Sequence, residues 1–256
     1  MINVEKIVTP SPAQWEIIIE GMRNAMNSWD KMDSFSTYIE DPETLNTADF
    51  EFFMGEEDER LATSLASKGP VHGKFLRMIP IYMTINAPLY WWKEYDTYKV
   101  GTVTNSCSTM HKIHSKEFTF NDFSCEHLFP FLEDGDIDRD LIVDIKHSDA
   151  KCASDLLSQT IFLLNHYRDK YNETKNKPMK DEKARKKLMK KYWHQMIQLL
   201  PTSYNQKRTL FLNYEVLRNI YIYRKEHKLN EWRELCKIIE TLPYAHLITG
   251  EKRDEN

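Results

Sequence analysis

The spacing of apolar residues predicts several amphipathic helices. Over residues 15–26 the apolar positions recur at helical intervals after Ser11-Pro12, a pair typical of a helix start. A second helix is predicted from Glu56 to Ser67, because four acidic residues lead an apolar-periodic run that Lys68-Gly69-Pro70 ends. Further helices are expected over residues 153–171, about 181–199 and about 217–241.

The remaining segments predict one strand and two stretches of loop. Residues 75–85 are rich in β-branched and aromatic side chains and predict a strand, in which Pro80 implies an edge position or a bulge. A loop is expected after the first helix through Asp41-Pro42, and an irregular aromatic region over residues 118–136.

An aromatic segment precedes a polar loop near the middle of the chain. Within residues 86–99, Trp91, Tyr95 and Tyr98 fall at i, i+4 and i+7, one face of a helix, and a polar loop follows at residues 105–111. Core packing is the favoured interpretation of these rings. The alternative is a pocket for a flat ligand, because aromatic side chains beside hydrogen-bonding groups suit such a pocket.

The composition is that of an ordinary soluble globular protein. The 256 residues are 41% hydrophobic and 29% charged, and they contain no internal repeat and no low-complexity linker. We therefore expect a single α+β domain over residues 1–249, with a mixed sheet flanked by long helices and a disordered tail at residues 250–256.

Charge and motif content exclude several classes of protein. The net charge of −4 excludes a globally basic nucleic-acid binder, and neither GxGxxG nor GxxxxGK[ST] occurs among the 7 glycines. No signal-peptide pattern and no apolar run of membrane-spanning length is present. A cytoplasmic protein with reduced cysteines and no membrane partner is expected.

The sequence favours neither a zinc site nor covalent hydrolase chemistry. A zinc site would need soft and imidazole ligands, which cluster here as Cys107, His111, His114, Cys125 and His127. Their spacing matches no compact zinc motif, so no metal is expected. Ser106 and Ser108 lie in no GxSxG elbow, so covalent hydrolase chemistry is not expected either.

A basic run leads into the predicted helix at 181–199. Its members are Lys175, Lys177, Lys180, Lys183, Arg185, Lys186, Lys187, Lys190 and Lys191. A solvated helix face is the favoured interpretation, and nucleic acid is not expected as a partner. The alternative is a phosphate-rich or nucleic-acid partner, because clustered Lys and Arg supply the electrostatic part of such binding.

Several segments, taken in order, resemble the flavin-dependent thymidylate synthases (ThyX). That family has an acidic-led helix, a small-residue turn with His, a Phe-rich strand and an aromatic helix that enters a signature loop. The corresponding segments here are residues 56–67, 69–72, 75–85 and 87–99. The signature ends in Asn-Glu-x-Ser-x-Arg-Tyr, and residues 105–111 match its Asn and its second Ser.

The C-terminal half resembles the family more closely. The family has a Leu-Pro, an Asn, then an Asn and an Arg on a long helix, followed by His and a Gln/Glu-rich stretch. The corresponding residues are Leu200-Pro201, Asn213, Asn219, Arg224, His227 and the run from Asn230 to Glu234. The spacing from Leu200-Pro201 to Arg224 agrees without gaps.

The resemblance implies a homotetrameric enzyme that binds FAD and dUMP where subunits meet. It implies reductive methylation of dUMP with NADPH and methylenetetrahydrofolate as co-substrates. By position, Arg224 matches the arginine that binds and polarises the pyrimidine, and its alternative is a surface arginine at a helix end. The other implied residues are Asn219, His227 and Lys99 for the cofactor, and Asn105, Ser106 and Ser108 for the substrate.

The chain departs from the family at charged positions. The family's Arg-His-Arg falls near Thr97-Tyr98-Lys99, and the signature Glu and Arg are Ser106 and Met110. Candidate replacements for the lost charges are Lys93, Lys99, Lys207 and Arg208. Two hypotheses follow: a divergent enzyme acting on dUMP or a related pyrimidine nucleotide, and a non-catalytic homologue that binds nucleotide or flavin.

Overall fold

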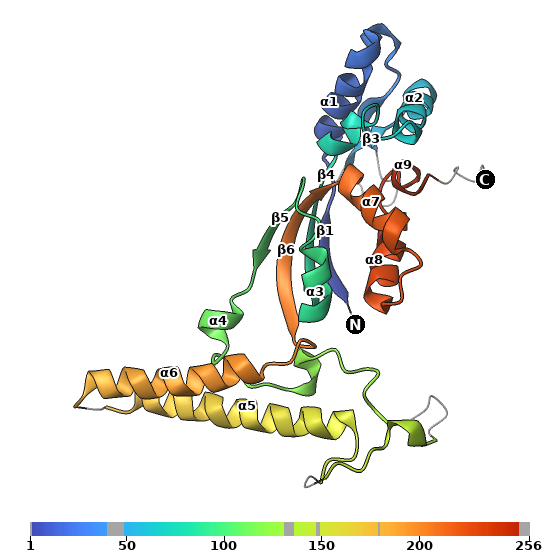
Figure 1. The fold of residues 1–256 in the computed structure, drawn as a ribbon. Helices are drawn as coiled ribbons and strands as arrows, with labels where there is room; N and C mark the ends of the chain where they lie inside the picture. Colours follow the sequence, from blue (N-terminus) through green and yellow to red (C-terminus); the bar gives the residue numbers. More distant parts are fainter. Residues whose placement is uncertain (1, 40–48, 131–135, 147–148, 179, 251–256) are drawn as a thin grey trace. The chain divides into compact units, whose positions relative to one another are not determined.

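The structure is a computed structural model, and it describes residues 2–39, 49–130, 136–146, 149–178 and 180–250. Helices and strands both contribute, so the predicted α+β class is confirmed (Figure 1). The strands are β1 Asn3–Val8, β2 Phe35–Ile39, β3 Asp49–Phe53, β4 Pro80–Pro88, β5 Val103–Ser106 and β6 Asn205–Asn213. The helices are α1 Pro12–Arg23, α2 Glu56–Ser67, α3 Leu89–Tyr95, α4 Thr109–Lys112, α5 Ala153–Asn176, α6 Glu182–Leu199, α7 Tyr214–Arg224, α8 Asn230–Glu240 and α9 His246–Thr249.

The chain forms two compact units. Unit 1 comprises Asn86–Glu94 and Ser106–Lys207, and unit 2 comprises Ile2–Ile85, Tyr95–Asn105 and the C-terminal part from Arg208 onward. The single domain over residues 1–249 therefore stays a prediction. Of the predicted tail, residues 251–256 lie outside the described residues.

The principal sheet has the strand order β1-β4-β6-β5, and most of its residues belong to unit 2 (Figure 1). β4 is an interior strand, so the edge position inferred from Pro80 is wrong. Pro80 is instead the first residue of β4, a position where a missing N–H is tolerated. The predicted strand also began too early, because Lys74–Met78 forms a 3-10 turn that buries Phe75 and Leu76.

The two N-terminal helices agree closely with the prediction. α1 follows a capping box in which the Ser11 hydroxyl and the Gln14 side chain each accept a hydrogen bond from the other's backbone N–H. α2 covers the predicted residues, and its free N–H groups are capped by Asp33, whose carboxylate accepts from Glu57 N at 2.9 Å and Asp58 N at 3.0 Å. Burial opposes ionisation of Asp33, but these donors hold its pKa below the ordinary value.

A buried ion pair joins α1 to α2. Arg23, the last residue of α1, donates from Nε to the Asp58 carboxylate, and both side chains are almost fully excluded from solvent. The same carboxylate accepts from the backbone N–H groups of Asp33 and Ser34 and from the Ser34 hydroxyl. The pair therefore fixes both helices to the segment that leads into β2.

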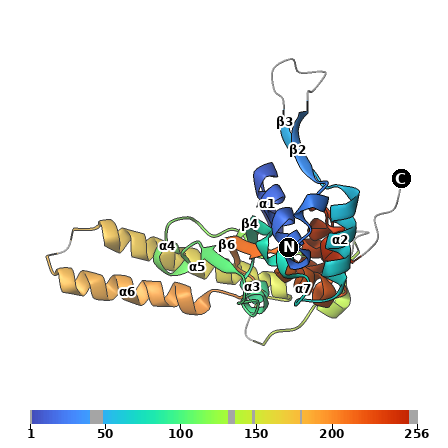
Figure 2. The ribbon, with the colours of Figure 1, turned by 90° about the horizontal axis from the view of Figure 1, so that it is seen from above.

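β2 and β3 form an antiparallel hairpin, and β2 lies within the region predicted as loop (Figure 2). Phe35 pairs with Phe53 across the strands with stacked rings 5.6 Å apart. Phe52 stacks on Trp15 of α1 at 5.8 Å, which holds the hairpin to the core of unit 2. Asp41-Pro42 lies outside the described residues.

The long C-terminal helix predicted from the sequence is two helices. α7 ends at Arg224 and α8 begins at Asn230, and the connection is closed by a hydrogen bond from His227 N to Arg224 O at 3.0 Å. The break allows α8 to turn its own apolar face inward, so that Trp232 and Ile239 are fully buried. A continuous 3.6-residue period could not place both apolar faces against one core.

Unit 1 is built around α5 and α6, which run side by side (Figures 1 and 2). α5 continues five residues beyond the predicted end, and α6 matches the prediction within one residue. Their apolar faces contribute to a cluster of Ile113, Phe118, Phe123, Leu157, Ile161, Leu164 and Met196. Among the described residues, no helix combines the length and apolarity needed to cross a bilayer.

Candidate functional site

Arg224 is held by two aromatic residues at the end of α7. Its Nε donates a hydrogen bond to the Tyr98 hydroxyl at 3.0 Å, and its Cζ lies 4.7 Å from the centroid of the Trp232 ring. Trp232 is fully buried, whereas Arg224 and Tyr98 are half-buried. Contact with an aromatic face stabilises a guanidinium and restricts its rotamers, so this cation is positioned in advance of any ligand.

The turn that follows Tyr98 contacts the start of α7, the helix whose other end carries Arg224. Asn213 caps the helix by accepting a hydrogen bond from Val216 N at 3.1 Å. Gly101, three residues after Tyr98, has φ +75°, and a Cβ there would lie 2.9 Å from Asn213 Nδ2. Only glycine fits this turn without displacing the cap. The turn that carries Tyr98 is therefore packed directly on the start of the helix that carries Arg224.

His227 lies in the connection between α7 and α8. Its Nδ1 accepts a hydrogen bond from Leu229 N at 3.2 Å, and its ring centroid is 6.4 Å from that of Trp232. Arg233 donates to the His227 carbonyl oxygen at 2.7 Å, which fixes the backbone of the connection. Because Nδ1 is an acceptor, the neutral ring carries its proton on Nε2.

The other residues predicted for this region are exposed. Asn219 is exposed on α7, next to Ile222 at 53% and Tyr223 at 74% exposure, an unusual pair of large side chains to leave in water. Lys99 is exposed in the turn after Tyr98, and Asn105 is exposed in β5. The structure therefore brings Tyr98, Arg224, Trp232 and His227 together within unit 2.

Ser106 and Ser108 belong to unit 1, and both are exposed. Ser108 has a structural task, since it caps α4 by accepting a hydrogen bond from His111 N at 2.9 Å. Cys107 between them is fixed to β6 by its N–H to Lys207 O at 2.9 Å and by Gln206 Nε2 to its own carbonyl at 3.0 Å. The signature-like loop is thus anchored by backbone contacts.

Arg208, a candidate replacement for the lost charges, already forms an ion pair with Asp96. Arg208 Nη1 lies 2.7 Å from Asp96 Oδ1, and the Arg208 side chain is only 13% exposed. Burial raises the pKa of the neighbouring Tyr95, which stays protonated and packs as predicted for core. Trp91 is also core, whereas Tyr98 lies beyond the end of α3 and contacts Arg224. Trp91 and Tyr95 are core as predicted, and half-buried Tyr98 packs against the rings of Tyr95 and Trp232 as well as contacting Arg224.

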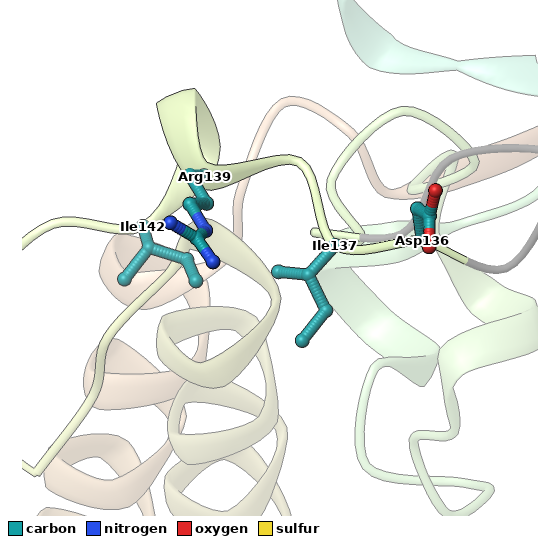
Figure 3. Close-up of a pocket in the computed structure, with 4 residues that line it drawn as sticks. All are labelled: Asp136, Ile137, Arg139 and Ile142. Atoms are coloured by element: carbon teal, nitrogen blue, oxygen red, sulfur yellow. The ribbon is translucent and has the colours of Figure 1, made fainter.

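A pocket of about 760 Å³ lies in residues 136–146 and contains none of the predicted site residues. The described residues that line it are Asp136, Ile137, Arg139 and Ile142, and Figure 3 shows the Arg139 guanidinium beside Ile142. Of these four, Asp136 and Arg139 have polar side chains and neither was predicted as a site residue, so this pocket is not the candidate site. Within the part of the chain that the structure describes, no three His, Cys, Asp or Glu residues gather as metal ligands.

The contacts of Arg224 with Tyr98 and Trp232 were not predicted from the sequence. Tyr98 is 126 positions away, and nothing local indicates the contact. The available signal was positional, because the resemblance puts the Arg-His-Arg of the ThyX family near Thr97-Tyr98-Lys99. Trp232 lies within the run from Asn230 to Glu234, and its burial could be expected only from the high average burial of tryptophan.

Neither a family model nor a curated protein matches the sequence. Among solved structures, the chain is similar to thymidylate synthase X (ThyX) from Helicobacter pylori with FAD and dUMP, with 15% identity and a TM-score of 0.55 over 98% of this chain and 96% of that chain. It is similar to a second Helicobacter pylori ThyX structure, also complexed with FAD and dUMP, with 14% identity and a TM-score of 0.54 over 98% and 97%. At these identities the likeness establishes a ThyX-like fold.

Proposed function

We propose that this chain is a divergent flavin-dependent thymidylate synthase-like enzyme that reductively methylates dUMP or a related pyrimidine nucleotide. The observation that carries the proposal is the Arg224 cluster: a half-buried guanidinium fixed by Tyr98 and Trp232 within a ThyX-like fold. Function belongs to sites rather than folds, so the proposal rests on this side chain and the fold supplies its context.

Arg224 fits the task of binding a pyrimidine. A guanidinium donates to carbonyl oxygens and stabilises negative charge that develops on them, and its strength rises where water is partly excluded. Tyr98 and Trp232 hold this cation on a helix end, so little reorganisation is needed when substrate arrives. In this proposal Arg224 binds and polarises the pyrimidine ring.

The exposed face of α7 fits a flavin. Asn219 offers an amide beside the apolar surfaces of Ile222 and Tyr223, a composition suited to a flat ring with polar edges. His227 offers an Nε2–H donor, and Lys99 a cation for the cofactor's phosphates. A bound FAD, reduced by NADPH, would supply the reducing equivalents, and methylenetetrahydrofolate the one-carbon group.

The substrate loop and the assembly are carried over from the resemblance. Asn105, Ser106 and Ser108 would contact the nucleotide, with Ser108 contributing through the α4 terminus that it caps. A homotetramer with FAD and dUMP where subunits meet belongs to the same proposal. Exposed Ile222 and Tyr223 agree with a surface that a cofactor or a second subunit covers.

The second candidate is a non-catalytic protein that binds nucleotide or flavin. Thr97-Tyr98-Lys99 in place of Arg-His-Arg favours it, because charged contacts are lost there. Tyr98 bonds Arg224, and Arg208 bonds Asp96, so these residues serve the structure of unit 2 as well.

Flavin binding is expected when the purified chain is mixed with FAD and passed over a desalting column. Retained oxidised flavin absorbs near about 450 nm, an intrinsic property of the isoalloxazine ring. Replacing Asn219 with Ala should weaken retention, and replacing the exposed Lys237 of α8 with Ala should leave it unchanged. A chain that neither copurifies with flavin nor retains added FAD contradicts both the enzyme and the flavin-binding alternative.

A further inference from the structure

Positive charge is concentrated in one stretch of unit 1. Between Lys175 and Lys191 the sequence has nine basic and two acidic residues, a balance of +7, in a chain whose net charge is −4. The remainder of the chain therefore carries −11. Such segregation is not needed for solubility, and it creates a local field that attracts polyanions.

Five lysines of α6 form a single stripe along the helix. They stand at i, i+3, i+4, i+7 and i+8, which places them on one face, and all are exposed. They are Lys183, Lys186, Lys187, Lys190 and Lys191. The stripe is about 12 Å long, because each helical residue advances about 1.5 Å.

The stripe faces away from the partner helix. Half a turn around α6 from the lysines, Met189 and Tyr192 are half-buried and Met196 is fully buried. Met196 packs in the same apolar cluster as Leu157 and Ile161 of α5. α6 lies beside α5 (Figures 1 and 2), and the lysine stripe on its opposite face is exposed to solvent.

Four of the five lysines of the stripe have no carboxylate partner among the described residues. No Asp or Glu occurs from Lys183 to Leu199, and Lys186 lies 3.8 Å from Glu182 at the edge of the stripe. In the described ranges the other four lysines pair with no carboxylate. Like charges at i, i+4 destabilise a helix, and ordinary solvated faces intersperse both signs. The five lysines are exposed, as expected for a solvated face, but this face carries a single sign of charge.

The start of α6 is held against the end of α5. Arg185 pairs with Glu182 and donates from Nη1 to Lys175 O at 2.7 Å, which ties α6 to the last turns of α5. Asp181 caps α6 by accepting from Lys183 N at 2.9 Å. Beside this end, partial burial and the charges of Lys175 and Lys112 lower the pKa of His114. These contacts hold the start of α6 against the end of α5.

We propose that the lysine stripe of α6, extended by Lys175, Lys177 and Lys180, binds the phosphate backbone of nucleic acid without sequence preference. Successive phosphates of one strand advance about 3.4 Å along a duplex, so the stripe spans about four of them. No large apolar side chain of α6 is exposed, which disfavours the membrane surface, because interfacial helices insert apolar residues beside their lysines. This inference does not depend on the proposed enzyme activity.

Salt-dependent binding to short, fluorescently labelled nucleic acids tests the proposal. Anisotropy is measured with duplex DNA, single-stranded DNA and RNA over a series of potassium chloride concentrations. Seven phosphate contacts on a duplex, one for each lysine of this surface except Lys186, which lies beside Glu182, predict a slope of log K against log salt of about −6. In the variant with Lys183, Lys187, Lys190 and Lys191 replaced by Gln, the slope should fall to about −3 and the affinity at low salt by about tenfold or more.

A matched variant tests whether binding depends on the stripe itself or on the net charge of the protein. It replaces the exposed Lys6, Lys68, Lys228 and Lys237 of unit 2 by Gln, and both variants have a net charge of −8. Glutamine keeps the helix propensity of lysine, and circular dichroism confirms folding. The proposal is overturned if binding does not depend on salt, or if both variants are weakened equally. It is also overturned if the wild-type protein binds phosphatidylserine vesicles but none of the three nucleic acids. A loss confined to the stripe variant supports it.

Discussion

Replacing Arg224 with Ala is expected to lower the affinity for dUMP by about 10- to 100-fold in the flavin-loaded protein. The loss corresponds to one charge-assisted hydrogen bond, whose net contribution is about 1.5–3 kcal/mol. Arg224→Lys should recover only part of the affinity, because an ammonium lacks the planar fork of the guanidinium and its contact with the Trp232 ring. Isothermal titration calorimetry measures all three affinities.

Two controls keep this result specific. Lys228→Ala removes the same charge from an exposed position four residues away and should leave dUMP binding unchanged. Circular dichroism of Arg224→Ala establishes that it is folded, since loss of the Tyr98 and Trp232 contacts costs some stability. A folded Arg224→Ala variant that binds dUMP as tightly as the wild type would remove Arg224 from the site.

Replacing Asp58 with Asn is expected to destabilise the protein by about 3–5 kcal/mol. The change removes the negative partner of Arg23 and leaves a buried guanidinium uncompensated, which is more costly than losing a surface pair. It also replaces a carboxylate oxygen that accepts from Asp33 N, Ser34 N and the Ser34 hydroxyl. Urea denaturation followed by far-ultraviolet circular dichroism measures the free energy of unfolding.

The neighbouring Glu57 provides the matched control. Its carboxylate pairs with Arg60 at the surface, where both side chains are more than half exposed. Glu57→Gln is the same isosteric change one residue earlier in α2, and it should cost less than about 1 kcal/mol. Equal effects of the two substitutions would show that the Arg23–Asp58 pair does not hold α1 to α2.

Local sequence signals were sufficient to predict the helices whose first turns contain capping or acidic residues. The capping box at Ser11 and Gln14, the acidic first turn of α2 and the Asp181 cap of α6 are all contained in a few residues. The ThyX-like fold was expected from the resemblance of an ordered series of segments to that family, and the likeness to the Helicobacter pylori structure confirms this fold over 98% of the chain.

Long-range contacts account for what the sequence left out. β6 lies between β4 and β5, and the alternation of buried Leu210 and Leu212 with less buried neighbours is its only local trace. The division of the C-terminal helix at residues 225–229 depends on packing Trp232 inward. The Tyr98–Arg224 hydrogen bond joins segments that no local pattern relates, so the sequence could indicate Arg224 as a candidate site residue but not its contact with Tyr98.

Release of tritium from [5-³H]dUMP is the most direct test of the proposed reaction, because methylation at C5 replaces that hydrogen. The purified chain is incubated with FAD, NADPH and methylenetetrahydrofolate, and the Arg224→Ala variant and a mixture without folate serve as controls. The proposal predicts tritium in water with the wild-type chain and none above background in either control. A wild-type chain that binds FAD and dUMP but releases no tritium would contradict it and leave the non-catalytic binding protein.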